Sequence, residues 1–163
     1  VLLYGGSNLI SFDFLVLANG FSWSEFDLET GRWTIPADRM KMRREFEVPL
    51  SNSAISLLDR IPRQVNSNLV FHGGKGKHLS DMTVLQVLRR LNIPCVVHGF
   101  RSTFSTWVAD QTEFPREIRE MSLAHKIGSD VELAYMRGPL LDKRRQLMET
   151  WGGYLLGDSV AIK

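Results

Sequence analysis

Four polar residues in the second half of the chain are of types that could do chemistry together. His98 and Arg101 stand three positions apart, and His125 precedes Tyr135 by ten positions, across Gly128-Ser129-Asp130. Arginine binds anions through a planar fork of donors, and histidine gains or loses a proton near neutral pH. Taken singly, a histidine at a helix end is more often structural, and a tyrosine on a short helix more often packs in a half-buried position.

Other kinds of reactive site find little support in the residue spacing. Asp27, Glu29, Glu113 and Glu117 show no spacing typical of a metal site or of an acid and base pair, and the GxSxG motif of serine hydrolases does not occur. The glycine-rich segment 71–78 fails the phosphate-loop pattern, which needs four residues between its glycines and a Ser or Thr after its lysine. We therefore expect no nucleotide-binding loop.

Cys95 is the one cysteine of the chain, so no internal disulfide can form. With four scattered histidines it makes no zinc ligand set. We expect Cys95 to be a core residue, because free cysteine is usually buried, and we expect the protein in a reducing compartment.

The composition is that of one ordinary soluble globular domain. The chain has 163 residues, of which 44% are hydrophobic and 23% charged, and its 20 basic and 18 acidic side chains give a net charge of +2. These values exclude a disordered, collagen-like or coiled-coil chain. A domain of this size buries roughly 70% of the surface of its unfolded chain, which is enough for a core without disulfides or metals.

Two clusters of basic residues stand out against this weak net charge. One holds Arg39, Lys41, Arg43 and Arg44, and the other is the run 143–145. Each cluster could present a basic edge to phosphates, or could be an ordinary solvated surface.

The beginning of the chain is unusual. Residue 1 is Val, so we expect Val1 to Gly20 to begin inside a longer reading frame and the chain to be a fragment. The apolar run from Leu9 to Ala18 contains Asp13, is too short to span a bilayer and lacks the basic region that precedes a secretory signal. We predict no membrane segment there, and a buried helix or an atypical N-terminal segment packed on the domain.

The first half of the chain predicts one small antiparallel sheet. Glu29-Thr30-Gly31 is a turn signal, and the alternation in 32–35 and in 46–50 predicts two strands flanking the basic loop. Apolar residues at helical spacing predict a short helix over 51–61, which Pro62 ends.

The second half predicts helices. Ser80 or Asp81 is expected to cap a helix whose core-facing stripe consists of Val84, Leu85, Leu88 and Leu91. Further helices are predicted over 101–110, 115–123, 130–136 and 140–155. In the last of these, one face carries Leu140, Leu147, Met148, Trp151 and Leu155, and Lys143, Arg144 and Arg145 lie on or beside the opposite one. The predicted fold class is α+β, mainly α, in a single domain over 1–163 with its sheet near the N-terminal third.

Three ordered passages together resemble the catalytic domain of the tyrosine recombinases, in particular phage and genomic-island integrases. They are the strand and β-turn segment 23–43 closed by Val48-Pro49-Leu50-Ser51, the HxxR box in His98-Gly99-Phe100-Arg101, and Leu123-Ala124-His125 followed ten residues later by Tyr135. The resemblance runs from about Trp23 to Tyr154, and several motifs in the right order are far more specific than any one of them.

The resemblance implies covalent catalysis on DNA. Tyr135 would attack a phosphodiester, form a 3′-phosphotyrosyl link and release a 5′-hydroxyl. Because tyrosine ordinarily has a pKa near 10, its hydroxyl needs a positive, hydrogen-bonding site to attack at neutral pH. Arg101 would stabilise the charge on the phosphate oxygens, and His98 and His125 would donate to the same oxygens or assist proton transfer. Lys41 matches the family lysine that protonates the leaving oxygen. The scheme requires no metal or other cofactor.

The resemblance also implies partners. The expected one is double-stranded DNA at an attachment site, with Arg39, Arg43 and Arg44 as further DNA-binding residues, in the cytoplasm of a bacterium at its nucleoid. Family members exchange C-terminal segments on DNA, so the helix over 140–155 would pack on a neighbouring subunit of a homo-oligomer, or else on its own domain. No membrane partner is expected.

The chain departs from the family at one catalytic position. Another family arginine lies about nine residues before the position of Trp23, which is Phe14 here, and the acidic position three residues further on is Leu17; no arginine precedes Arg32. Losing one donor to a developing oxyanion costs roughly 10²–10³ in kcat. We expect 1–21 to be replaced, frameshifted or truncated, the family's N-terminal core-binding and arm-binding domains to be absent, and catalysis to be impaired.

Two alternatives to an impaired recombinase stay open. The missing arginine favours a catalytically inactive remnant that acts only as a DNA-binding or protein-interaction module. A plain helical domain with coincidental motifs would have to explain all of the motifs together.

Overall fold

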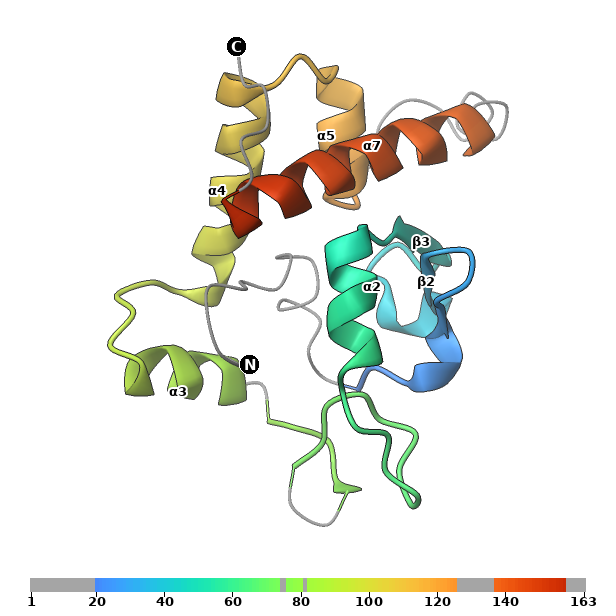
Figure 1. Ribbon diagram of the computed structural model, residues 1–163, viewed down its shortest axis with the longest axis vertical. Helices are drawn as coiled ribbons and strands as arrows, with labels where there is room; N and C mark the ends of the chain where they lie inside the picture. Colours follow the sequence, from blue (N-terminus) through green and yellow to red (C-terminus); the bar gives the residue numbers. More distant parts are fainter. Residues whose placement is uncertain (1–19, 74–75, 81, 126–136, 158–163) are drawn as a thin grey trace.

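The computed structural model describes residues 20–73, 76–80, 82–125 and 137–157. Its fold is α+β and mainly α, as predicted, and Figure 1 shows the arrangement of the elements. The elements in chain order are η1 (Trp23–Glu25), β1 (Phe26–Asp27), β2 (Arg32–Ile35), η2 (Ala37–Arg39), β3 (Phe46–Pro49), α2 (Asn52–Asp59), α3 (Thr83–Arg90), α4 (Val97–Gln111), α5 (Arg116–Ser122) and α7 (Arg137–Leu156).

The sheet has three antiparallel strands in the order β1-β2-β3. The two strands predicted on either side of the basic loop are β2 and β3, with Trp33 opposite Val48. The turn signal is also confirmed, since Gly31 adopts a φ of +61° between β1 and β2, a conformation that glycine reaches without strain. β1 was not predicted, because two residues are too few to show an alternation.

Buried apolar side chains form two clusters, one on each side of α7. The first lies between the sheet and α2, and includes Phe21, Trp33, Ile35, Val48, Leu50 and Leu58. The second joins α4, α5 and α7, and includes Phe104, Trp107, Val108, Ile118, Leu147, Met148 and Trp151. Figure 1 shows α7 running between α4 and α5 on one side and α2 with the sheet on the other.

The predicted apolar face of α7 is confirmed. Leu140, Leu147, Met148 and Trp151 are buried in the second cluster, and Leu155 packs against it. The helix therefore packs on its own domain, which is the simpler of the two arrangements expected for it. Exchange of a C-terminal segment between subunits remains a prediction.

The other side of α7 is not a solvated basic edge, which corrects the expectation for Arg144. Only 5% of Arg144 is exposed; its Nη2 donates to the carbonyl oxygen of Glu47 in β3 at 2.8 Å, and its guanidinium lies 4.8 Å from the centre of the Phe46 ring. Arg145 likewise donates to the carbonyl of Gly31 at 3.1 Å. The physical reason is that α7 is covered on both sides, so Arg144 faces a strand carbonyl and Arg145 faces carbonyls of the turn before β2. Of the three basic residues, only Lys143 is exposed.

The contact between α7 and α2 depends on a glycine. A Cβ at Gly152 would lie 2.6 Å from Ser53 Oγ and 3.1 Å from Ser51 Oγ, so only glycine lets the helices approach this closely. Ser51 is itself the N-cap of α2, where its Oγ accepts from the backbone N–H of Ala54 at 3.3 Å. Glu149 Oε1 accepts from the backbone N–H of Asn52 at 2.8 Å, which places a negative charge at the positive end of α2.

Three further expectations for the region before α4 were wrong. The N-cap of α3 is Met82 instead of Ser80. The hydroxyl of Ser80 lies 3.2 Å from the hydroxyl of Thr83, the first residue of the helix. Leu88 is 3% exposed as expected, but Leu91, expected in the same stripe, is 39% exposed, because it is the C-cap and lies beyond the last turn of α3. Cys95 is half-buried instead of lying in the core, because it falls in the link between α3 and α4.

Some expectations fall outside the described residues. These are the N-terminal segment up to residue 19, Asp81 as a cap and the helix over 130–136. Among the helices that the structure does describe, none combines the length and the apolar character needed to cross a bilayer.

Replacing Arg144 with alanine tests how α7 is held. We expect Arg144→Ala to lower the free energy of unfolding by about 2–3 kcal/mol, because it removes a buried, charged hydrogen-bond donor and its contact with Phe46. The matched control is the exposed neighbour, Lys143→Ala, which should stay within about 0.5 kcal/mol of the wild type. Urea denaturation measures both, and equal losses would show that Arg144 does not anchor the helix.

Replacing Gly152 with alanine tests the close approach of α2 and α7. Although alanine favours a helix over glycine by about 1 kcal/mol, the clash with Ser51 and Ser53 should outweigh this and leave the protein about 1 kcal/mol less stable. At Gly99 in α4 the nearest atom to an added Cβ is 3.8 Å away, so Gly99→Ala should be neutral or stabilising. Thermal unfolding should show a lower Tm for Gly152→Ala and an equal or higher Tm for Gly99→Ala.

Candidate active site

The first turn of α4 carries His98 and Arg101. The chain is extended at the N-cap, Val96, and becomes helical at Val97, earlier than the predicted start at 101. Residues three apart on a helix are neighbours on its surface, so the two side chains start from the same face. His98 is exposed and Arg101 half-buried.

The C-terminal end of α5 positions His125. Ala124 adopts a left-handed φ of 54°, the backbone N–H of Ala124 donates to the carbonyl of Met121 at 3.0 Å, and that of His125 donates to the carbonyl of Glu120 at 2.9 Å. These two bonds define a Schellman motif, which ends the helix and folds the chain back over its last turn. His125 is therefore fixed above Glu120 by the main chain.

Arg101 reaches across from α4 to this helix end. Its Nη2 donates to the carbonyl oxygen of Leu123 and lies 2.7 Å from His125 Nε2. The carbonyls at a helix C-terminus carry partial negative charge, so a guanidinium there is favourable. Arg101 and His125, which the sequence placed in separate pairs with His98 and Tyr135, are thus in direct contact.

The other nitrogen of His125 contacts Glu120. Nδ1 lies 2.6 Å from Glu120 Oε2, and the second carboxylate oxygen accepts from Arg119 Nη2 at 3.1 Å. The hydrogen bond with His125 is the main cause that lowers the pKa of Glu120 below its ordinary value of 4.5; partial burial opposes it, and Arg119 adds to the lowering. Glu120 is therefore ionised at neutral pH.

The loop between η2 and β3 carries the first basic cluster. Lys41, Arg43 and Arg44 are exposed on it. Arg43 adopts a left-handed φ of 52°, which costs a residue with a Cβ roughly 1–2 kcal/mol. The structure therefore holds a strained turn where three cations reach solvent.

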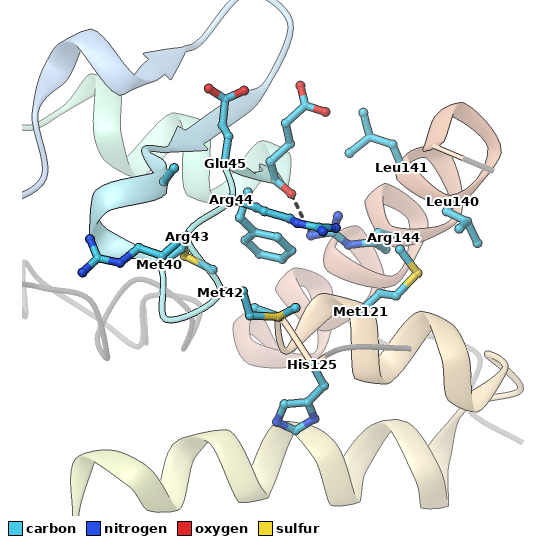
Figure 2. Close-up of a pocket in the computed structure, with 14 residues that line it drawn as sticks. Met40, Met42, Arg43, Arg44, Glu45, Met121, His125, Leu140, Leu141 and Arg144 are labelled. Atoms are coloured by element: carbon cyan, nitrogen blue, oxygen red, sulfur yellow. Dashed lines mark hydrogen bonds between the residues drawn. The ribbon is translucent and has the colours of Figure 1, made fainter. Parts of the chain in front are cut away.

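A pocket of about 500 Å³ lies between this loop and the helices α5 and α7. Figure 2 shows His125 at the α5 side, Arg43 and Arg44 on the loop side, and Arg144 reaching in from α7. Its apolar lining includes Met40, Met42, Phe46, Met121, Leu140 and Leu141. The pocket thus has basic groups on two opposite walls and a largely apolar interior.

Of the predicted site residues, His125, Arg43 and Arg44 line the pocket, whereas Lys41, His98, Arg101 and Arg39 are not among its lining residues. Arg39 forms an ion pair with Glu25 and donates from Nη1 to the carbonyl of Gly20 at 3.0 Å, so its guanidinium already has partners within the fold. Tyr135 lies outside the described residues. The roles of all the predicted site residues remain predictions.

Sequence reasoning missed Glu120, which the structure places in contact with His125. Its signal was present but weak: an acidic residue five positions before a histidine, where a helix ends between them. Once the helix end is known, the Schellman motif brings these two positions together. Within the described parts of the chain, no three His, Cys, Asp or Glu residues are grouped so that they could hold a metal ion.

Comparison with known proteins agrees with the resemblance seen in the motifs. The profile of the phage integrase family matches residues 18–137. Prophage integrase IntA of Escherichia coli K12 is 34% identical over 134 residues, which cover 79% of this chain and 32% of the relative.

Two phage proteins show the same pattern. The integrase of Shigella phage Sf6 is 34% identical over 139 residues, covering 82% of this chain and 36% of its own length. The integrase of Enterobacteria phage P4 is 31% identical over 154 residues, covering 82% and 35%. The chain thus spans about a third of the length of these relatives, and no solved structure matches it significantly. Since the family profile covers most of its residues, the chain belongs to the phage integrase family, the tyrosine recombinases.

Proposed function

We propose that this chain performs the strand cleavage and rejoining of site-specific DNA recombination, through a 3′-phosphotyrosine intermediate. The observation that carries the proposal is the contact of Arg101 with His125 at 2.7 Å, beside a pocket with Arg43 and Arg44 on its far wall. A guanidinium, an imidazole and further arginines in one region are suited to bind a DNA phosphate.

In the proposed reaction, the hydroxyl oxygen of Tyr135 attacks the phosphorus atom and its proton passes to a nearby histidine. The P–O bond to the 5′ oxygen breaks, and Lys41 gives that oxygen a proton, so that a 5′-hydroxyl leaves. Arg101, with His98 and His125, stabilises the negative charge that spreads over the non-bridging oxygens. Rejoining is the same sequence in reverse.

Double-stranded DNA is the proposed partner. Lys41, Arg43 and Arg44 lie exposed on one loop and would contact the backbone near the cleaved phosphate. Arg39 would have to give up its contacts with Glu25 to do the same, so we expect it to contribute less.

A second candidate is a catalytically inactive remnant that only binds DNA or protein. The observation favouring it is Phe14 at the position where the family has an arginine. With one phosphate-binding arginine fewer, cleavage would be roughly 10²–10³ slower even if the other groups work.

Covalent trapping distinguishes the two functions. The protein is incubated with a nicked suicide duplex, and adducts are resolved on a denaturing gel. We expect an adduct from the wild type that Tyr135→Phe abolishes, because only the tyrosine hydroxyl can form the phosphate ester. Tyr154→Phe is the matched control: this exposed tyrosine stacks on Trp151, and its loss of a hydroxyl should leave the adduct unchanged.

Two outcomes would contradict the proposal. An adduct that persists in Tyr135→Phe would exclude Tyr135 as the nucleophile. An adduct that forms only after the family's N-terminal helix and its arginine have been restored would mean that this chain has the fold without the activity.

A further inference from the structure

Contacts link the side chains of Arg101, His125 and Glu120. Glu120 is the one of the three to which the proposed reaction assigns no task. Yet its carboxylate is the direct partner of a predicted catalytic histidine, with 2.6 Å between Oε2 and Nδ1. About 22% of its side chain is exposed, against 48% of that of His125. The acid thus lies beneath the imidazole, which faces solvent.

The contacts of His125 determine which ring nitrogen carries the proton. A guanidinium has only donors, so His125 Nε2, 2.7 Å from Arg101 Nη2, has to accept. The proton of the neutral ring is then on Nδ1, from which it is donated to the Glu120 carboxylate. The hydrogen-bond partner of one ring nitrogen sets the state of the other.

The backbone holds the two residues together independently of DNA. The N–H of His125 donates to the carbonyl of Glu120 at 2.9 Å, so one residue contacts the other through both main chain and side chain. Arg119 Nη2, at 3.1 Å from the second carboxylate oxygen, holds the acid in place. The lowered pKa of Glu120 keeps this acceptor ionised at neutral pH.

We propose that Glu120 is a positioning residue that fixes His125 in the Nδ1–H tautomer, with Nε2 directed at the group that Arg101 binds. Resting on the proposed function, this gives His125 a defined task. When a DNA phosphate takes over the guanidinium of Arg101, Nε2 presents a lone pair that can accept the proton of Tyr135. The ionised Glu120 then stabilises the imidazolium, which can donate to the phosphate from Nε2.

The tautomer can be measured on the whole chain without DNA. Long-range ¹H–¹⁵N correlation spectra of the histidine rings at a fixed neutral pH should show His125 with its proton on Nδ1. In an Arg101→Ala background, which removes the donor that would by itself keep Nε2 unprotonated, Glu120→Ala should lose this form in favour of the Nε2–H tautomer. Glu120→Gln in the same background should largely retain it, because the amide oxygen still accepts. Glu117→Gln, an exposed position on the same helix, is the matched control and should change nothing.

The single Glu120 variants, with Arg101 intact, are then tested in the trapping reaction. Glu120→Ala should slow adduct formation by about 10–100-fold, as loss of an orienting partner commonly does, and Glu120→Gln should recover part of the rate. A wild-type His125 with its proton on Nε2, or an unchanged tautomer when Glu120→Ala is made in the Arg101→Ala background, would overturn the positioning role. Because the tautomer is measured without DNA, absence of an adduct in the wild type would count against the proposed function alone.

Discussion

The polar contacts of α7 with the sheet and with α2 are what the rest of the structure depends on. The second hydrophobic cluster packs on one side of this helix, and on the other side Arg144 and Arg145 donate to carbonyls of the sheet region while Glu149 accepts from the start of α2. Apolar packing alone would leave the rotation of a helix between two layers weakly defined, whereas donors that meet specific carbonyls fix it.

The position of the site follows from this arrangement. The basic loop runs directly into β3, the strand that Arg144 contacts, and α5 packs on the other side of α7. Arg43 and Arg44 therefore line the same pocket as His125, although more than 80 residues separate them in sequence. A shift of α7 would separate the loop from the α5 end.

The groups at the α5 end combine structural and chemical tasks. Arg101 neutralises the helix terminus by donating to Leu123, and it contacts His125 at the same time. Without DNA, these two partners already hold the guanidinium in place. Little reorganisation is therefore needed when a phosphate binds. A bound phosphate would compete for the same donors, so binding would couple directly to the state of His125.

The parts that the sequence could predict are those determined by local pattern. The strands over 32–35 and 46–49, the turn at Gly31 and the apolar face of α7 each follow from residue order over a few positions. Motif order likewise named Arg101 and His125 as site residues, although it paired them with His98 and Tyr135 instead of with each other. The burial of Arg144 and the contact of Glu120 with His125 depend on which elements pack together, and a charged residue on a helix gives no sign of that beforehand.

Titration of the isotope-labelled protein with a short DNA duplex tests most directly whether α7 assembles one phosphate-binding site from two sides. A single assembled site predicts that the side-chain signals of Arg43, Arg44, Arg101 and His125 shift together along one binding curve, and that the affinity falls as salt is raised. Shifts confined to the loop arginines, with Arg101 and His125 unchanged at saturation, would contradict it.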